Sequence, residues 1–127
     1  MATTSSFIDI RMWQQAHCFV LEMYSLTATY PKHELFGLVS QFRRAAISIP
    51  ANIAEGYKRL SRTEKLRFFN IAQSSLEECR YYIILSKDIN YIDNNQSEKL
   101  NTLLEDTSKS LNNYCERILI DLNAKTK

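Results

Sequence analysis

The sequence predicts an all-α protein that folds as an antiparallel up-down-up-down four-helix bundle. Glycine and proline are scarce, with 2 residues each among 127, so turns should be few and helices long. Four stretches repeat apolar residues at steps of three and four, which is the spacing of one helix face. Short polar breaks separate the stretches, and short connections favour antiparallel neighbours. The length fits a single domain, residues 1–127, with a continuous apolar core.

The first helix is expected over about residues 9–30, where two apolar stripes run side by side. They are offset by one residue, or about 100° around the helix. Pro31 should end the element because proline cannot continue a helix, and His17 is expected as a hydrogen-bonded histidine of the core. One stripe holds Ile10, Trp13, His17, Val20, Tyr24 and Thr27, and the other holds Met12, Ala16, Phe19, Met23, Leu26 and Tyr30.

The second helix is expected over about residues 33–55, and Pro50 lies inside it. The apolar repeat keeps its phase across Pro50, which favours a kink near Ser48 over a break. Asn52 should satisfy a backbone group that the kink frees, and Gly56 should be the left-handed residue after the helix end. The main stripe is Leu35, Val39, Phe42, Ala46, Ile49 and Ile53, and its neighbour is Phe36, Ser40, Arg43 and Ile47.

The third and fourth helices are expected over about residues 62–90 and 94–123. Ser61 and Glu64 have the spacing of a capping box at the start of the third helix. A polar turn at residues 93–95 precedes the fourth helix, which should fray at residues 125–127. The main stripes are Phe69, Ala72, Leu76, Cys79, Ile83 and Ser86 in the third helix, and Leu100, Leu104, Thr107, Leu111, Tyr114 and Ile118 in the fourth.

The first three helices each carry a second apolar stripe, and two interpretations of it stay open. The stripes could widen the core of one chain, or they could pack against another subunit, since interface cores are rich in aromatic residues and Met. Arg43 would then form an ion pair with Glu55 or Glu78. The aromatic members are Phe19, Tyr30, Phe36, Phe68 and Tyr82, and the expected oligomer interface is Phe36, Arg43, Ile47, Phe68, Glu78 and Tyr82.

Positive charge is concentrated in the second quarter of the chain. Residues 41–67 hold seven basic and two acidic residues, whereas the rest of the chain holds nine basic and twelve acidic ones. Neutralising several phosphates with such a cluster would give salt-sensitive nucleic-acid binding, and a merely solvated charged face remains the alternative. The expected phosphate contacts are Arg44, Lys58, Arg59, Arg62, Lys65 and Arg67, of which the last five surround the turn between the second and third helices.

Residues 41–56, QFRRAAISIPANIAEG, resemble the hallmark of a bacterial family called four helix bundle proteins or 23S ribosomal RNA intervening-sequence proteins. Residues 71–78, IAQSSLEE, match the family's second block, with Ser74 where glycine is usual and Glu78 at the usual acidic position. Trp13-Gln14 and Tyr30-Pro31 also fit, and the accessory variability determinant of diversity-generating retroelements is similar. The resemblance implies a ring-like homopentamer of four-helix bundles. It also implies a basic surface that touches nucleic acid or its processing partners, and no catalysis.

Other chemistries find little support in the sequence. Cys18, Cys79 and Cys115 include no C-x-x-C pair, which is typical of reduced thiols in the cytoplasm. Neither His17 nor His33 follows a Glu by three residues, so no di-iron site, other metal or cofactor is expected. Residues 1–6 do not form a leader, and no apolar run approaches the ~20 residues that span a membrane, so no membrane partner is expected.

The function expected from these observations is non-enzymatic. Glu55 and Glu78 lack an accompanying nucleophile or histidine, so they are expected as partners of Arg43 rather than as an acid–base pair. An oligomeric bundle would present its basic surface to the phosphates of RNA or DNA. The alternative is a protein-interaction module that docks a nucleic-acid-processing enzyme, such as a reverse transcriptase, with no direct nucleic-acid contact.

Overall fold

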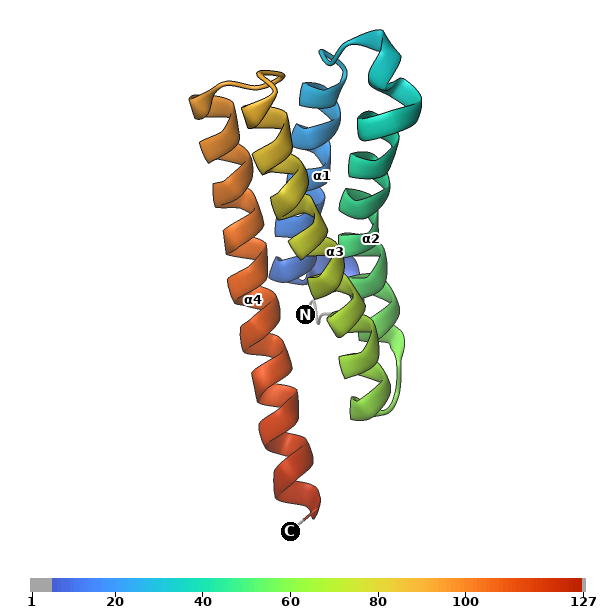
Figure 1. Cartoon of the computed structure of the whole chain (residues 1–127). Coiled ribbons are helices and arrows are strands. Elements are labelled where there is room, and N and C mark those ends of the chain that lie inside the picture. Colours follow the sequence, from blue (N-terminus) through green and yellow to red (C-terminus); the bar gives the residue numbers. More distant parts are fainter. Residues whose placement is uncertain (1–5, 127) are drawn as a thin grey trace.

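The computed structural model describes residues 6–126, with side chains through residue 123, and it confirms the all-α bundle. The four long helices are α1 (Arg11–Thr27), α2 (Ser40–Lys58), α3 (Arg62–Asp88) and α4 (Asn94–Thr126). They run alternately up and down, and each lies beside the next in the chain (Figure 1). No strand occurs among the described residues. Of residues 125–127, which were expected to fray, the last lies outside the described part.

Short helical turns lead into two of these helices. η1 (Phe7–Asp9) precedes α1, and η2 (Lys32–Glu34) and the π-turn η3 (Leu35–Val39) precede α2. The backbone leaves helical geometry at Gly37, with φ −111° and ψ −111°. The second predicted helix therefore changes direction at Gly37. α2 runs through Pro50 as one helix, as the unbroken apolar phase predicted, and the kink expected near Ser48 stays a prediction.

Asn52 bonds Ser48 rather than Ala46, whose carbonyl lies four residues before Pro50 and lacks a proline N–H donor, so the role expected of Asn52 at that carbonyl stays a prediction. Its Nδ2 donates to the Ser48 carbonyl at 2.8 Å and to the Ser48 Oγ at 2.9 Å. The Ser48 Oγ also accepts a hydrogen bond from Ser75 Oγ at 2.8 Å. The side-chain amide thus supports the backbone next to the proline, and the chain of hydrogen bonds ties α2 to α3.

The core consists of one face of each helix, and for three helices it is the predicted one. Every main-stripe residue of α3 is buried, as are those of α2 and α4 apart from the exposed Leu35 and the half-buried Tyr114. In α1 the stripe containing Phe19 and Tyr30 forms the core, so these aromatics widen the core of a single chain. The prediction for His17 is wrong, because its ring is exposed and stacks on Trp13 at 4.9 Å.

The role expected of Gly56 is also wrong. Gly56 lies inside α2, and no glycine among the described residues has a positive φ. A Cβ at this position would lie 2.6 Å from Cε1 of the fully buried Phe69 on α3. Glycine is required here because the Phe69 ring packs directly on the α2 backbone. The left-handed residue that ends a helix is Asn90, after α3, with φ 66°.

The end of the bundle formed by the α1–α2 and α3–α4 connections is called the closed end (Figure 1). Its members Tyr30 and Ile92 are buried, and the rings of Tyr30 and Tyr91 lie 5.1 Å apart. The Tyr91 hydroxyl donates to Glu34 Oε2 at 2.7 Å, which joins the two connections. At the opposite end α2 and α3 are joined by a tight turn, and α4 extends past it.

Candidate nucleic-acid interface

The turn between α2 and α3 carries five of the six residues expected to contact phosphates. α2 ends where Arg59 becomes extended (φ −65°, ψ 146°), and α3 begins after Ser61, whose Oγ accepts from the Glu64 amide at 3.1 Å. The prediction of Ser61 as N-cap is confirmed, although the Glu64 carboxylate accepts from Arg67 Nε. We call this region the basic end, defined by Lys58, Arg59, Arg62, Lys65 and Arg67.

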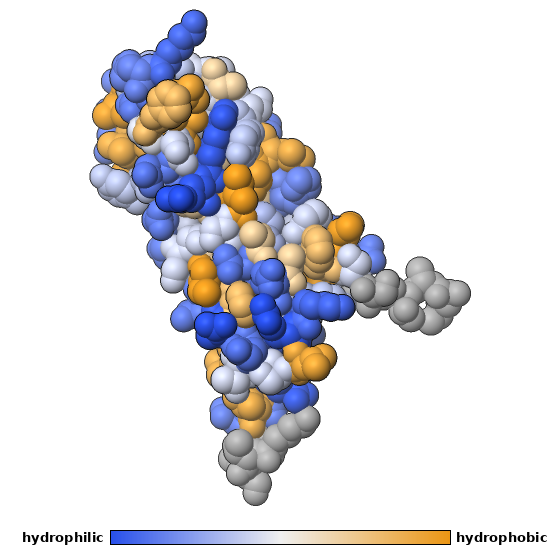
Figure 2. All heavy atoms as spheres, turned by 90° about the vertical axis from the view of Figure 1, so that its right-hand side faces the viewer, coloured by the Kyte–Doolittle hydropathy of each residue, from blue (hydrophilic) through white to orange (hydrophobic). Residues whose placement is uncertain are grey.

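Hydrophilic side chains crowd the lower part of the face seen in Figure 2, with isolated apolar ones between them.

Arg44 lies apart from the basic end, because it precedes Lys58 by fourteen residues of α2. At 1.5 Å per residue this separates their backbones by about 21 Å. One compact ligand therefore cannot contact Arg44 and the basic end together within a single chain.

Lys65 has a structural role. Its Nζ donates to the carbonyls of Gly56 at 3.3 Å and Tyr57 at 2.6 Å, so the ammonium reaches from α3 to the C-terminus of α2. Burial lowers the pKa of Lys65. A cation at this position bonds carbonyls of the last turn of α2, where the Gly56 carbonyl also accepts from the Arg59 amide, and it complements the helix dipole. Lys65 therefore has a role in the fold, and its contact with phosphates stays a prediction.

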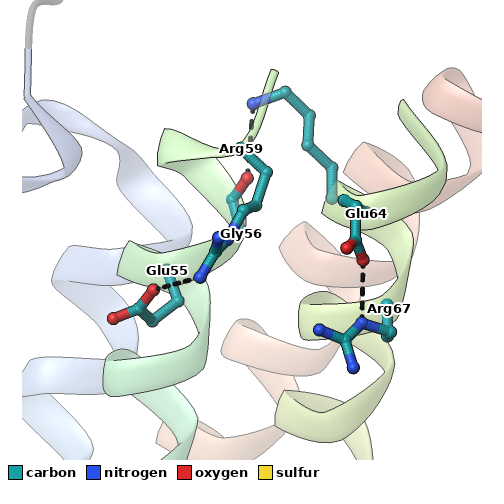
Figure 3. A network of polar contacts seen from close by, with 6 residues as sticks. Glu55, Gly56, Arg59, Glu64 and Arg67 are labelled. Carbon is teal, nitrogen blue, oxygen red and sulfur yellow. Dashed lines mark hydrogen bonds and ion pairs between the residues drawn. The ribbon is translucent and has the colours of Figure 1, made fainter. Parts of the chain in front are cut away.

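Two of the arginines form ion pairs on the surface (Figure 3). Arg59 donates to Glu55 Oε2 at 3.0 Å within one turn of helix, and Arg67 donates to Glu64 Oε2 at 2.8 Å. Glu55 therefore does not pair with Arg43 in this chain. Exposed pairs of this kind contribute little stability, about 0–1 kcal/mol.

The Phe68 ring contacts both of these arginines. The guanidinium carbon of Arg59 is 4.5 Å from the centre of this ring, and that of Arg67 is 4.9 Å from it. The Phe68 ring is half-buried. Arg59 and Arg67 cover part of this ring, which was expected to lie at an oligomer interface. Stacked guanidiniums are held by cation–π attraction to the ring.

Lys58 and Arg62 have no carboxylate partner in the described part of the chain. Over residues 6–123, no Asp or Glu pairs with either of them or with Arg44. Leu60, midway between them, is fully exposed at 101% of its reference area. Leu60 belongs to none of the predicted stripes and to none of the predicted sites. Its exposure could have been predicted from the sequence, because Leu60 lies in a short charged turn outside the apolar stripes of the second and third helices.

The residues expected at an oligomer interface have varied surroundings. Arg43 Nε donates to Thr27 Oγ1 at 3.0 Å and its NH2 to the Tyr24 carbonyl at 3.3 Å, so its partners lie on α1. Glu78 accepts from the Tyr82 hydroxyl at 3.1 Å. In this chain neither glutamate forms the expected ion pair with Arg43. Phe36 (92% exposed) and Ile47 (43%) remain open on the surface, and a subunit contact through them stays a prediction.

Little else in the described part of the chain suggests a catalytic or metal site. No group of three His, Cys, Asp or Glu residues there could hold a metal ion. A hollow of about 390 Å³ between α1 and α4 is lined by the Glu22–Lys99 ion pair and by neutral side chains. Burial raises the pKa of the Cys115 thiol to about 11, and it also raises that of Cys79. No helix in the described region is both long and apolar enough to cross a membrane.

The fold defines a class of all-α four-helix bundles with a basic turn between the second and third helices. Within that class the chain belongs to the 23S rRNA-intervening sequence protein family, which it matches over residues 8–113. The sequence blocks at residues 41–56 and 71–78 both lie within this match.

A solved structure from Bacteroides thetaiotaomicron VPI-5482 has the same fold. That protein, of unknown function and from the S23 ribosomal protein family, is 24% identical to this chain, with a TM-score of 0.76. The similarity covers 83% of this chain and 95% of that one. At this identity the likeness concerns the fold alone. A search of curated proteins found no match.

Proposed function

We propose that this protein is a non-enzymatic homo-oligomer, a pentamer by family resemblance, whose basic end binds the phosphates of RNA or DNA in the cytoplasm. The observation that carries the proposal is the pair of unpartnered cations, Lys58 and Arg62, on either side of an exposed turn. The description of its family refers to 23S rRNA, which is consistent with this class of ligand. A ring would repeat the basic end in every subunit, so weak phosphate contacts would add up.

The test compares two double variants that carry the same change in charge. Lys58→Glu with Arg62→Glu reverses charge at the basic end, whereas Lys32→Glu with Lys109→Glu reverses it at two exposed lysines elsewhere. Binding of a labelled RNA hairpin and of duplex DNA is followed by fluorescence anisotropy from 50 to ~300 mM salt. We expect the first variant to lose about 100-fold in affinity and part of the salt dependence, and the second to lose far less.

Absence of wild-type binding at ~50 mM salt, or binding that salt does not weaken, contradicts the nucleic-acid proposal. Light scattering on the same samples measures the number of subunits. A monomer at the concentrations used contradicts the oligomer. Lys65 is left unchanged in both variants because its ammonium caps α2.

Leu60 favours a second candidate function. A fully exposed leucine surrounded by cations is suited to anchor in an apolar pocket of a protein partner, for example a nucleic-acid-processing enzyme with an acidic rim. Leu60→Ser should then abolish partner binding in the absence of nucleic acid. If the basic end binds nucleic-acid phosphates alone, this variant should bind the RNA hairpin as the wild type does.

A further inference from the structure

We propose that Arg59 and Arg67 form a phosphate clamp of the nucleic-acid site and that Phe68 is its positioning residue. This inference rests on the proposed function and adds a specific geometry to it. The two arginines come from different helices, and both guanidiniums lie over one ring. Each is also held at one edge by a carboxylate, from Glu55 and from Glu64. The contacts fix where these two cations point.

The contacts leave most of each guanidinium free for a ligand. A guanidinium carries five N–H donors. Arg59 uses NH2 toward Glu55, and Arg67 uses Nε toward Glu64. The guanidinium carbon of each arginine lies over the Phe68 ring, whereas hydrogen bonds leave through the edges of the guanidinium. The remaining N–H groups are therefore available for the bidentate geometry that phosphate oxygens favour.

Access to the clamp is open. The Arg59 and Arg67 side chains are 44% and 63% exposed. Both guanidinium carbons lie within 5 Å of the same ring centre and are therefore at most about 10 Å apart, so two neighbouring phosphates of a strand can contact one guanidinium each. A flexible arginine loses side-chain entropy when it binds. Holding both on Phe68 before the ligand arrives reduces that loss.

Glu55 and Glu64 compete with phosphate for the two arginines. Each carboxylate keeps its arginine in place, and its negative charge also repels an approaching phosphate. Solvent-exposed pairs of this kind are weak, so a phosphate can add to the guanidinium or displace the carboxylate. A protein ligand with isolated carboxylates would gain less, because it lacks the array of closely spaced oxyanions that a nucleic-acid backbone offers.

The test uses Phe68→Leu, which keeps an apolar side chain without a π face, and Phe68→Trp, which restores one. Ile71→Leu, on the same helix face at an exposed position, is the control. With the labelled RNA hairpin in ~100 mM salt, we expect Phe68→Leu to bind roughly fivefold more weakly and Phe68→Trp to bind as the wild type does. Ile71→Leu should leave the affinity unchanged. In NMR spectra, the Nε–Hε signals of Arg59 and Arg67 should move in Phe68→Leu because the ring current is lost.

Several outcomes overturn the clamp. If the wild type binds and Phe68→Leu binds equally well, the clamp is wrong while the proposed function stands. If no wild-type binding occurs, both fail. A changed solution mass of Phe68→Leu places the residue at a subunit contact and overturns the positioning role. If polyglutamate displaces the hairpin as well as unlabelled RNA does at equal charge concentration, the site responds to acidic polymers in general, which also contradicts a phosphate clamp.

Discussion

The two ends of the bundle use their polar groups differently. At the closed end, Glu34 and Tyr91 join two connections by a hydrogen bond of 2.7 Å, and Tyr30 is buried beside them. At the basic end, Lys58 and Arg62 have no carboxylate partner among the described residues. The bond at the closed end joins two connections of the fold, whereas at the basic end Lys58 and Arg62 lack a carboxylate partner in the described region and Arg59 and Arg67 have only exposed, weak pairs, so these cations are available to a ligand. Substitutions at the closed end should therefore change the stability of the fold, and substitutions of cations at the basic end should change nucleic-acid affinity.

The largest expected change in stability is at Gly56, beneath the basic end. Gly56→Ala brings a Cβ against the buried Phe69 ring. Alanine gains about 1 kcal/mol of helix propensity over glycine, but overpacking a tight core costs about 1–3 kcal/mol. Because the new Cβ would lie only 2.6 Å from the ring, the cost should reach the upper end of that range, and we expect a net loss of about 2 kcal/mol in the free energy of unfolding, measured by urea denaturation. Nucleic-acid affinity at temperatures where the variant is folded should change little.

Phe69→Leu in the Gly56→Ala background tests the cause of that loss. If the ring is what the new methyl group meets, the double variant loses less stability than the two single variants together. Simple additivity would show that the close approach of Phe69 to Gly56 is not what limits this position.

The next effect in size is at Arg43, near the closed end of α1. Its guanidinium bonds the Thr27 hydroxyl and the Tyr24 carbonyl and lies 4.3 Å from the centre of the Tyr24 ring. A cation there complements the C-terminus of α1. Arg43→Ala should lower the free energy of unfolding by about 1–2 kcal/mol, whereas the exposed neighbour Arg44→Ala should stay within about 0.5 kcal/mol.

Measurements at two protein concentrations separate this role from a subunit contact. A structural role within one chain lowers the stability of Arg43→Ala equally at both concentrations. If the variant instead loses stability only on dilution, or changes its solution mass, Arg43 acts between subunits as the sequence first suggested.

Sequence periodicity was sufficient for the core of α2, α3 and α4 because each has one clearly more apolar face. In α1 two apolar stripes lie one residue apart, and periodicity cannot tell which faces the core. Contacts with neighbouring helices decide this, and they bury Phe19 while leaving His17 exposed. The role of Gly56 was hidden for a similar reason, since Phe69 meets it from another helix.

The candidate site was predictable as a concentration of charge but not as a set of contacts. The count of basic residues in the segment located the basic end. Whether Lys65 faces a ligand or the carbonyls of α2 depends on how α3 starts relative to α2. The contact of Phe68 with two arginines likewise depends on side-chain rotamers and on the shape of the turn, which composition and spacing do not specify.

The smallest effect, and the one that tests the closed end most directly, depends on pH. The hydrogen bond from Tyr91 lowers the pKa of the Glu34 carboxyl, and it raises the pKa of Tyr91. Because the pKa of Glu34 is lower in the folded chain, the folded state binds fewer protons than the unfolded one. This contribution is therefore present above the ordinary carboxyl pKa and is lost as the pH falls through the lowered value.

Tyr91→Phe removes the main cause of that lowering. We expect the variant to be less stable than the wild type at neutral pH, with a difference that shrinks toward acid pH, in urea denaturation followed between about pH 7 and pH 3. Tyr81→Phe, an exposed tyrosine on α3, should parallel the wild type throughout. A pH-independent difference for Tyr91→Phe would mean that packing against Tyr30, rather than the bond to Glu34, holds the closed end together. The polar groups of the closed end would then contribute no more to stability than the exposed ion pairs of the basic end do.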